Sequence, residues 1–368
     1  MAVSFVTRLR LTLAIVGLLA IADAIHMDRT ASAQEGGMRV GTQGTKFTNN
    51  GVPVNNGSRA EGLLINFRAI HAVVDDYNPK TRSLWSYPDG PWDANRNTNE
   101  FIAMLPTYAA RGLNMVTVGL QGGHPRFKCN ASYSTAPRNF SAFTFDGGFR
   151  ADAKARLQRV IASADQVGII VTVQYFYQNQ DGRLSGNAAV IKATQEATQF
   201  LENLPNDNIL VEVANEVTAN NYKHSALQPS GIDDRIDQIH GIWPGALVSV
   251  SMSSGGNYPS AVAQRIDWSS IHANSINSTT ELVGKINNLE KLGHPVVVTE
   301  DGWHGLPMEP AINAGAGWGL YVQGCEFEGN YEGSARYRDG FQSPPINWNI
   351  LDPYKRAFFE KAQELTSI

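Results

Sequence analysis

Cysteine is nearly missing from this chain: 368 residues contain only Cys129 and Cys325. No group of cysteine and histidine has metal-ligand spacing, and the eight histidines are scattered, so we expect no metal. Two cysteines this far apart leave two states open, a single disulfide in an oxidising compartment or two inert thiols. Their spacing does not choose between these states.

Runs of positive charge are missing as well. Lys and Arg number 30 against 34 Asp and Glu, which gives a formal net charge of −4, and no basic stretch stands out. Binding to nucleic acid phosphates needs a basic patch, so we expect no nucleic-acid partner. No Gly-x-Gly-x-x-Gly follows the first expected strand, so a dinucleotide-binding fold lacks its main support and we expect no cofactor.

Apolar runs long enough to suggest a membrane are confined to the N-terminus. Arg8 and Arg10 precede an apolar stretch over residues 11–22, which is too short to span a bilayer comfortably. Ala-Ser-Ala at 31–33 is a small-x-small cleavage site. We therefore expect a signal peptide over 1–33 and an exported protein, periplasmic or extracellular, with no membrane contact after cleavage. An uncleaved anchor is the alternative.

The segment that follows, residues 34–60, is rich in Gly, Asn and Thr. Its Asn50-Gly51 pair lies between two short extended stretches, which indicates an N-terminal hairpin that could cover the bottom of a barrel. An unstructured lead is the other reading.

From residue 61 to 368 the chain alternates helical and extended patterns. Apolar stripes at helical spacing run over 151–167 and 187–204, and we expect further helices near 100–110 and 352–365. Gly112, Gly168 and Gly293 each stand between a helical stretch and an apolar one, where glycine ends a helix by taking a left-handed conformation. The strand candidates are 63–68, 113–118, 169–173, 209–216, 246–251, 268–272, 295–302 and 317–321. Alternating helices and strands predict an α/β fold with a parallel sheet. Eight such units favour a closed (β/α)8 TIM barrel over an open doubly wound sheet.

Two of these strands deliver a glutamate at their carboxyl ends. The fourth runs into Asn215-Glu216 and the seventh into Glu300. Strands four and seven stand on opposite sides of a barrel mouth, so the two carboxylates can face each other across a cleft. Hydrolysis of a glycosidic bond uses such a pair of carboxyl groups. A separation of about 5 Å leads to retention of the anomeric configuration, and a wider gap admits a water and leads to inversion.

Asn215-Glu216 on strand four and Glu300 on strand seven resemble clan A glycoside hydrolases, with the family 5 cellulase and mannanase group as the nearest pattern. The resemblance spans about residues 60–365 but rests on few residues. It implies a retaining enzyme with Glu216 as acid/base and Glu300 as nucleophile, while Asn215 holds the sugar 2-hydroxyl. It also implies an oligo- or polysaccharide substrate with β linkages.

Several positions depart from that pattern. Thr117 stands where the family carries an arginine at the end of strand two, and Arg68 on strand one can supply the guanidinium. Strand three often ends in histidine, and Gln174-Tyr175-Phe176-Tyr177 stands there instead.

Strand six shows His272-Ala273-Asn274 in place of His-x-Tyr, so Tyr175 or Tyr177 is the candidate for the missing tyrosine. Trp318 on strand eight fits the aromatic platform beneath the sugar, and Trp303 is the alternative. The substrate-binding candidates are therefore Asn215, Arg68, His272, Trp318, Tyr175 and Tyr177.

The chemistry sets its own conditions. Glu216 must hold a proton to act as an acid, so its pKa has to be raised by burial or by a second carboxylate. Glu300 must stay ionised, which a nearby Arg68 or His272 favours. The plainer alternatives are a glutamate that merely pairs with a barrel arginine and a histidine that only holds structure.

Two other functions remain open. A non-catalytic carbohydrate-binding protein on a degenerate barrel fits the unusual residues of strands two and six, although the intact glutamate pair argues against it. A metallohydrolase is disfavoured because no His-x-His follows strand one.

Because strands two and eight both flank strand one, a Cys129–Cys325 bridge across that rim is a further hypothesis.

Overall fold

The computed structural model describes residues 37–123, 139–219, 221–302, 307–322, 340–351 and 353–368. Cys129, Trp303, Cys325 and the segment 1–33 lie outside these ranges, so the disulfide, the Trp303 platform and the signal peptide stay predictions. Within the ranges, no helix is both long and apolar enough to cross a membrane.

A parallel barrel forms the body of the fold, as predicted. Its strands are β4 (Ile65–Arg68), β5 (Met115–Gly119), β6 (Ile170–Phe176), β7 (Ile209–Ala214), β8 (Val248–Ser249), β9 (Ser251–Met252), β10 (Ser269–His272), β11 (Val296–Asp301) and β12 (Ala316–Leu320). They are hydrogen-bonded in the order β8-β7-β6-β5-β4-β12-β11-β10-β9. Only Val250 separates β8 from β9. One extended segment therefore pairs with β7 through its first half and with β10 through its second, which closes the sheet.

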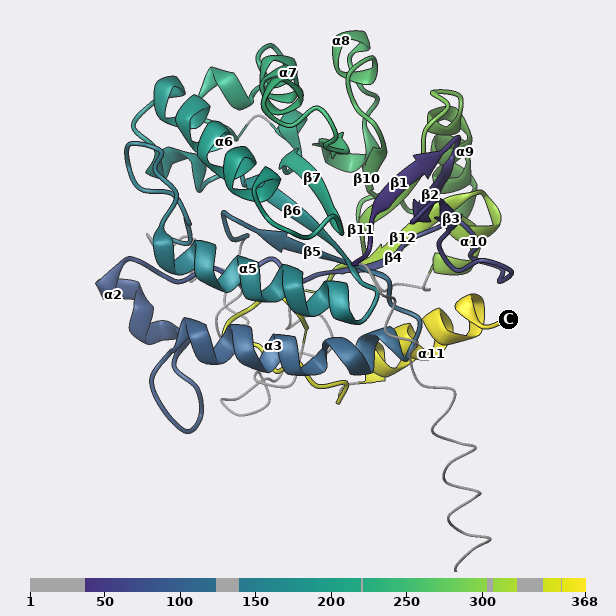
Figure 1. The fold of residues 1–368 in the computed structure, drawn as a ribbon, viewed down its shortest axis with the longest axis horizontal. Helices are drawn as coiled ribbons and strands as arrows, with labels where there is room; N and C mark the ends of the chain where they lie inside the picture. The colour runs from purple at the N-terminus through teal and green to yellow at the C-terminus, as the bar shows by residue number, and fades with distance from the viewer. Residues whose placement is uncertain (1–36, 124–138, 220, 303–306, 323–339, 352) are drawn as a thin grey trace, which may run out of the picture. The chain divides into compact units, whose positions relative to one another are not determined.

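Helices lie outside the strands (Figure 1). In the described part of the chain, the helices of four residues or more are α2 (Pro79–Arg82), α3 (Ala94–Ala109), α5 (Ala151–Gln166), α6 (Asn187–Glu202), α7 (Ile232–Ile242), α8 (Ser260–Ala263), α9 (Thr279–Glu290), α10 (Met308–Asn313) and α11 (Pro353–Thr366). Helix α3 begins earlier than its apolar pattern indicates because the Asp93 side chain caps it by accepting the N–H of Asn95 and Arg96. Helix α7 was not predicted, although Ile232, Ile236 and Ile239 form its buried stripe.

The predicted helix ends are confirmed. Gly112, Gly168 and Gly293 have φ of 85°, 77° and 82°, the left-handed conformation that lets the chain leave a helix and turn into a strand. Each lies at the amino ends of the strands, so the opposite rim is left to the loops that follow the strands.

The N-terminal hairpin is present and gains a third strand. Strands β1 (Val40–Gln43), β2 (Lys46–Asn49) and β3 (Val52–Pro53) form an antiparallel sheet in that order. Phe47 of β2 packs edge-on against Trp268, with ring centroids 6.4 Å apart. Both rings join a cluster of side chains from the amino ends of the barrel strands: Leu64, Met115, Ile170, Leu210 and Val297. Burying Phe47 contributes roughly 2–3 kcal/mol, and the sheet covers the bottom of the barrel.

Helix α11 ends at this same bottom. The backbone N–H of Ala60 donates to the carbonyl of Leu365 at 3.2 Å. Gly112 lies so close to Ala362 and Thr366 that a Cβ at residue 112 would stand 2.8 Å from the Ala362 carbonyl oxygen. The open rim at the carboxyl ends of the strands is therefore the place to look for chemistry.

Candidate active site

A register shift turns Glu300 into the barrel. Along β11 the side chain of Val297 lies in the cluster at the barrel bottom and that of Val298 lies in the core with the helices. Alternation then points Thr299 inward, where its hydroxyl contacts Ser270 Oγ at 2.6 Å. Strict alternation would send Glu300 outward. However, the register with β10 shifts by one residue: Ile271 pairs with Val298 and His272 pairs with Glu300, so Thr299 is left out of the pairing. This bulge puts two successive side chains on the inner side.

Glu216 reaches the same space by a strained backbone. It lies two residues past the end of β7 and has φ of 49°, a left-handed conformation that costs a residue with a Cβ roughly 1–2 kcal/mol. Its N–H donates to Ser251 Oγ at 2.9 Å. Its carboxylate accepts from the Gln178 amide at 2.9 Å and is about one-fifth exposed, whereas that of Glu300 is 5% exposed. Strain of this kind is concentrated at functional sites.

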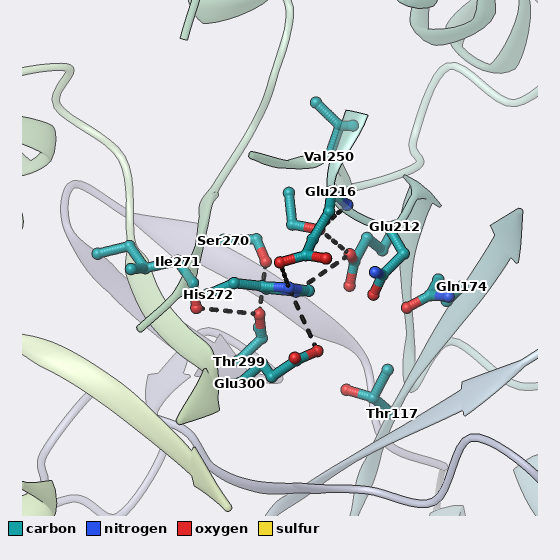
Figure 2. Close-up of polar contacts among 12 residues, drawn as sticks. Thr117, Gln174, Glu212, Glu216, Val250, Ser270, Ile271, His272, Thr299 and Glu300 are labelled. Carbon is teal, nitrogen blue, oxygen red and sulfur yellow. Dashed lines mark hydrogen bonds and ion pairs between the residues drawn. The ribbon is translucent and has the colours of Figure 1, made fainter. Parts of the chain in front are cut away.

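His272 lies between the two carboxylates, as Figure 2 shows. Its Nδ1 is 3.2 Å from Glu300 Oε2 and 3.5 Å from Glu216 Oε1. One oxygen of each glutamate and one ring nitrogen all lie within 4.8 Å of one another. The predicted pair therefore meets in space, and a proton on Nδ1 faces both members.

Arg68 forms the floor of this space from the end of β4. Its Nε lies 3.2 Å from Glu300 Oε2, and its side chain is 1% exposed. One Nη donates to Gln174 at 2.7 Å and to Asn215 at 2.8 Å, and the other lies 3.4 Å from His272 Nε2. Gln174 and Asn215 thus fix one end of the guanidinium while its Nε faces Glu300.

Two amides that the sequence analysis did not select complete the site. The Asn215 amide donates to Gln178 Oε1 at 2.9 Å, and Gln178 donates on to Glu216, so Arg68 is joined to Glu216 through a chain of amides. Asn274 donates to Glu300 Oε1 at 2.7 Å. Each of these two follows a strand end by two residues, after β6 and β10, and that position is the only signal in the sequence that could have marked them.

The charges are coupled through His272. Burial lowers the pKa of His272, but the charge of Glu300 and the bond to Glu216 raise it overall. Burial raises the pKa of Glu300, against the lowering effects of His272 and Arg68. For Glu216 burial also raises the pKa, yet His272, with Arg68 and Gln178, holds it below its ordinary value. In the free protein, then, a shared proton favours His272 and Glu300 over Glu216.

Two predicted contact residues do not lie with Glu216 and Glu300. Trp318 is fully buried on the helix side of β12, where it packs against Phe358 of α11 and donates its indole N–H to Asp301 Oδ2 at 3.0 Å. Tyr175 is buried on the helix side of β6, where its hydroxyl meets Thr198 of α6 at 3.2 Å. A sugar cannot reach either ring, which corrects the expectation for both.

Tyr177 is close to the site. It follows the end of β6, its N–H donates to Gln121 at 3.1 Å, and its side chain is mostly buried. Burial lowers the pKa of Arg68, but Glu300 and Glu212, and to a smaller extent Tyr177 and Tyr321, raise it. Tyr177 therefore stays a candidate for the place of the missing tyrosine, and Tyr321, just past β12, is a second one that the sequence analysis missed.

Among the described residues, Glu216, His272 and Glu300 are the one group whose ligand atoms are close enough to reach a common metal ion. The Arg68 guanidinium within 3.2 Å of Glu300 opposes a divalent cation there. The hydrogen bonds of Gln178 and Asn274 also occupy the outer oxygens of the two glutamates. The donor set fits a proton-handling pair better than a metal centre.

No family model and no curated protein sequence matches the chain. Solved structures of glycoside hydrolases do match, at low identity. A protein from Bacteroides vulgatus provisionally assigned as a glycoside hydrolase shares 13% identity over 90% of this chain, with a TM-score of 0.55. A family 5 glycoside hydrolase from the same organism shares 15% identity over 84% of the chain (TM-score 0.52), and β-mannanase from the blue mussel Mytilus edulis shares 13% over 88% (TM-score 0.51). The chain spans 61% and 66% of the two Bacteroides chains and 96% of the mannanase. At this identity the likeness shows the barrel fold.

Proposed function

We propose that this protein is a retaining glycoside hydrolase, a divergent relative of the clan A enzymes, that cleaves a β-linked glycan. The observation that carries the proposal is the approach of Glu216 and Glu300, which present oxygens within 4.8 Å of each other at the carboxyl rim of a (β/α)8 barrel. Retaining glycosidases hold their two carboxyl groups about 5 Å apart, whereas inverting ones leave room for a water between them.

Glu300 is the proposed nucleophile. Three donor groups face it, from Arg68, His272 and Asn274, and all three favour its ionised form. Glu216 is the proposed acid/base because its carboxylate is the more exposed of the two and accepts from a neutral amide, Gln178.

The proton preference of the free protein runs against these roles, since His272 lowers the pKa of Glu216. A sugar that enters between Glu216 and His272 would break that contact. Glu216 would then take up the proton that it gives to the leaving group. The proposal therefore requires that binding of substrate raises the pKa of Glu216.

The reaction follows in two steps. Glu300 attacks the anomeric carbon while Glu216 gives its proton to the glycosidic oxygen, so the leaving sugar departs as an alcohol and a glycosyl ester forms on Glu300. Glu216, now ionised, takes a proton from a water that attacks the same carbon, and Glu300 leaves as a carboxylate. Asn215, held between Arg68 and Gln178, is the proposed partner of the sugar 2-hydroxyl.

The substrate class is a β-linked oligo- or polysaccharide outside the cytoplasm. One of the solved structures with this fold is a β-mannanase, which makes β-mannan the first polysaccharide to try. The expected signal at 1–33 is the reason to place the protein in the periplasm or outside the cell.

The test is hydrolysis of a panel of aryl β-glycosides and β-linked polysaccharides by the wild type, Glu216→Gln and Glu300→Gln. Exposed Glu202→Gln on α6 is the matched control. We expect both site variants to lose at least 100-fold in kcat/KM, the control to keep full activity, and proton NMR to show the β anomer of the product first. Sugar binding without turnover by the wild type would instead point to the carbohydrate-binding alternative, and turnover that survives either site change would end the assignment.

A further inference from the structure

Glu212 is a third carboxylate beneath the site, and the proposed reaction does not use it. It lies on β7 four residues before Glu216, and its side chain is fully buried. Its Oε1 is 3.9 Å from His272 Nε2, and it appears with the other acidic groups in Figure 2. A carboxylate is costly to bury, so a buried one calls for specific partners.

The specific partner of Glu212 is Ser251 on the closing segment of the barrel. Ser251 Oγ donates to Glu212 Oε1 at 2.7 Å and accepts the backbone N–H of Glu216 at 2.9 Å. A backbone N–H can only donate, and a serine hydroxyl has one proton to give. Ser251 Oγ therefore accepts the N–H of Glu216 with a lone pair and donates its own hydrogen bond to Glu212.

The residue held in this way is the strained one. Glu216 has φ of 49°, and the bond to Ser251 fixes its N–H in the direction that this conformation requires. The left-handed turn brings the carboxylate of Glu216 to His272 and into range of Glu300. Without the bond, the backbone is free to relax toward a conformation that carries the carboxylate away.

We propose that Glu212 is a positioning residue for the acid/base: acting through the Ser251 hydroxyl, it holds the backbone of Glu216 and so sets the distance between Glu216 and Glu300. This inference rests on the proposed function. It assigns no contact with substrate to either Glu212 or Ser251.

The experiment uses leaving groups that differ in their need for an acid. An activated leaving group such as dinitrophenolate departs almost unaided, whereas an alkyl or sugar leaving group needs the proton of Glu216. The constant kcat/KM reports the first chemical step, in which the leaving group departs. For Ser251→Ala and Glu212→Leu we expect kcat/KM to fall 10- to 100-fold for glycosides with poor leaving groups and less than threefold for the glycoside with the activated one. Glu216→Ala sets the upper limit of this selectivity.

Conservative variants separate the hydrogen-bond chain from the charge of Glu212. Ser251→Thr keeps a hydroxyl and is expected to restore activity on poor leaving groups. Glu212→Gln keeps an acceptor for Ser251 and is expected to lose less than Glu212→Leu. The matched control is Ser249→Ala. Ser249 is buried two residues before Ser251 and pairs with Glu212 in the sheet, but its hydroxyl makes no hydrogen bond to Glu212 or Glu216.

If Glu212 acts only through Ser251, the double variant Ser251→Ala/Glu212→Leu should lose no more activity on poor leaving groups than the worse of the two single variants. Equal losses on both kinds of leaving group, or fully additive losses, would overturn the inference and leave Glu212 a purely structural residue. So would a Glu212→Gln variant as poor as Glu212→Leu, which would point to charge alone. If Glu216→Ala itself shows no leaving-group selectivity, or the wild type hydrolyses none of the glycosides, the proposed function fails first, and this inference with it.

Discussion

Arg68 Nε and Glu300 Oε2 lie 3.2 Å apart, and the two side chains are 1% and 5% exposed. They come from the first and seventh barrel strands, so the ion pair joins two segments that are far apart in the sequence. Removal of one partner of a buried pair leaves the other charge without compensation, which costs more than the pair itself contributes.

The first prediction follows from that asymmetry. Arg68→Met should lower the free energy of unfolding by about 3–5 kcal/mol because Glu300 loses its buried counter-charge and the Asn215 side-chain oxygen loses its donor. Arg68→Lys should lose less stability but at least 100-fold in kcat, since one ammonium cannot reach Glu300, Gln174 and Asn215 together. Urea denaturation and initial rates on an aryl glycoside measure both. Arg68→Met at wild-type stability would contradict the buried pair.

A second prediction concerns the acid limb of the pH profile. The Asn274 amide bonds Glu300 Oε1 and favours its ionised form, so Asn274→Ala should raise the pKa of Glu300. A hydrogen bond to a charged group is worth about 1.5–3 kcal/mol, which corresponds to a shift of about 1–2 pH units. The lower limb of kcat/KM should move to higher pH by that amount. Asn277→Ala, in the same loop, should leave it in place; equal profiles for the two variants would speak against the bond.

The third prediction concerns Trp318 and distinguishes a core residue from an aromatic platform for the sugar. Because the ring packs against Phe358 and bonds Asp301, Trp318→Phe should lower stability by about 1–3 kcal/mol. KM for an oligosaccharide should not change. Thermal unfolding and steady-state kinetics on the same preparation decide, and a variant with wild-type Tm and a tenfold higher KM would restore the platform role.

Much of this arrangement could be predicted from the sequence, for a physical reason. Glu216 and Glu300 could be found because parallel strands bring their carboxyl ends to one rim, whatever the details of the loops. Arg68 and His272 followed from the same rule. The side of the barrel that each residue faces was harder to predict, because it depends on register.

Trp318 shows the difficulty. Its strand reads Ala-Gly-Trp-Gly-Leu, with no polar residue to mark an inner face, and pairing with Ile65 sends the ring to the helices. Glu300 faces inward only through the shift after Ile271. Gln178 and Asn274 lie on loops, where single-sequence patterns carry little information.

The fourth prediction concerns stability and pH. Burial raises the pKa of Asp301 to about 6 from the ordinary value near 3.8, so the folded protein binds this proton more tightly than the unfolded chain does. The tighter proton binding of Asp301 stabilises the folded state. This stabilisation is fully present below about pH 4 and is lost as the pH rises through 6. A shift of this size corresponds to about 3 kcal/mol at most.

Asp301→Asn cannot ionise and keeps an acceptor for the Trp318 indole. It should therefore be more stable than the wild type at pH 8 and no more stable at pH 4. Thermal unfolding at the two values measures the difference. A gain that is the same at both would mean that Asp301 is not the group that titrates.

The small sheet around Phe47 and the last turn of α11 both lie at the closed bottom of the barrel, away from the rim that carries Glu216 and Glu300. The protein tethered to a solid support through Ile368 would therefore present that rim to the liquid. Insoluble glycans are large and cannot turn to meet a badly oriented catalyst. For such a substrate, attachment at this end should preserve turnover, whereas random coupling through surface lysines should lose part of it.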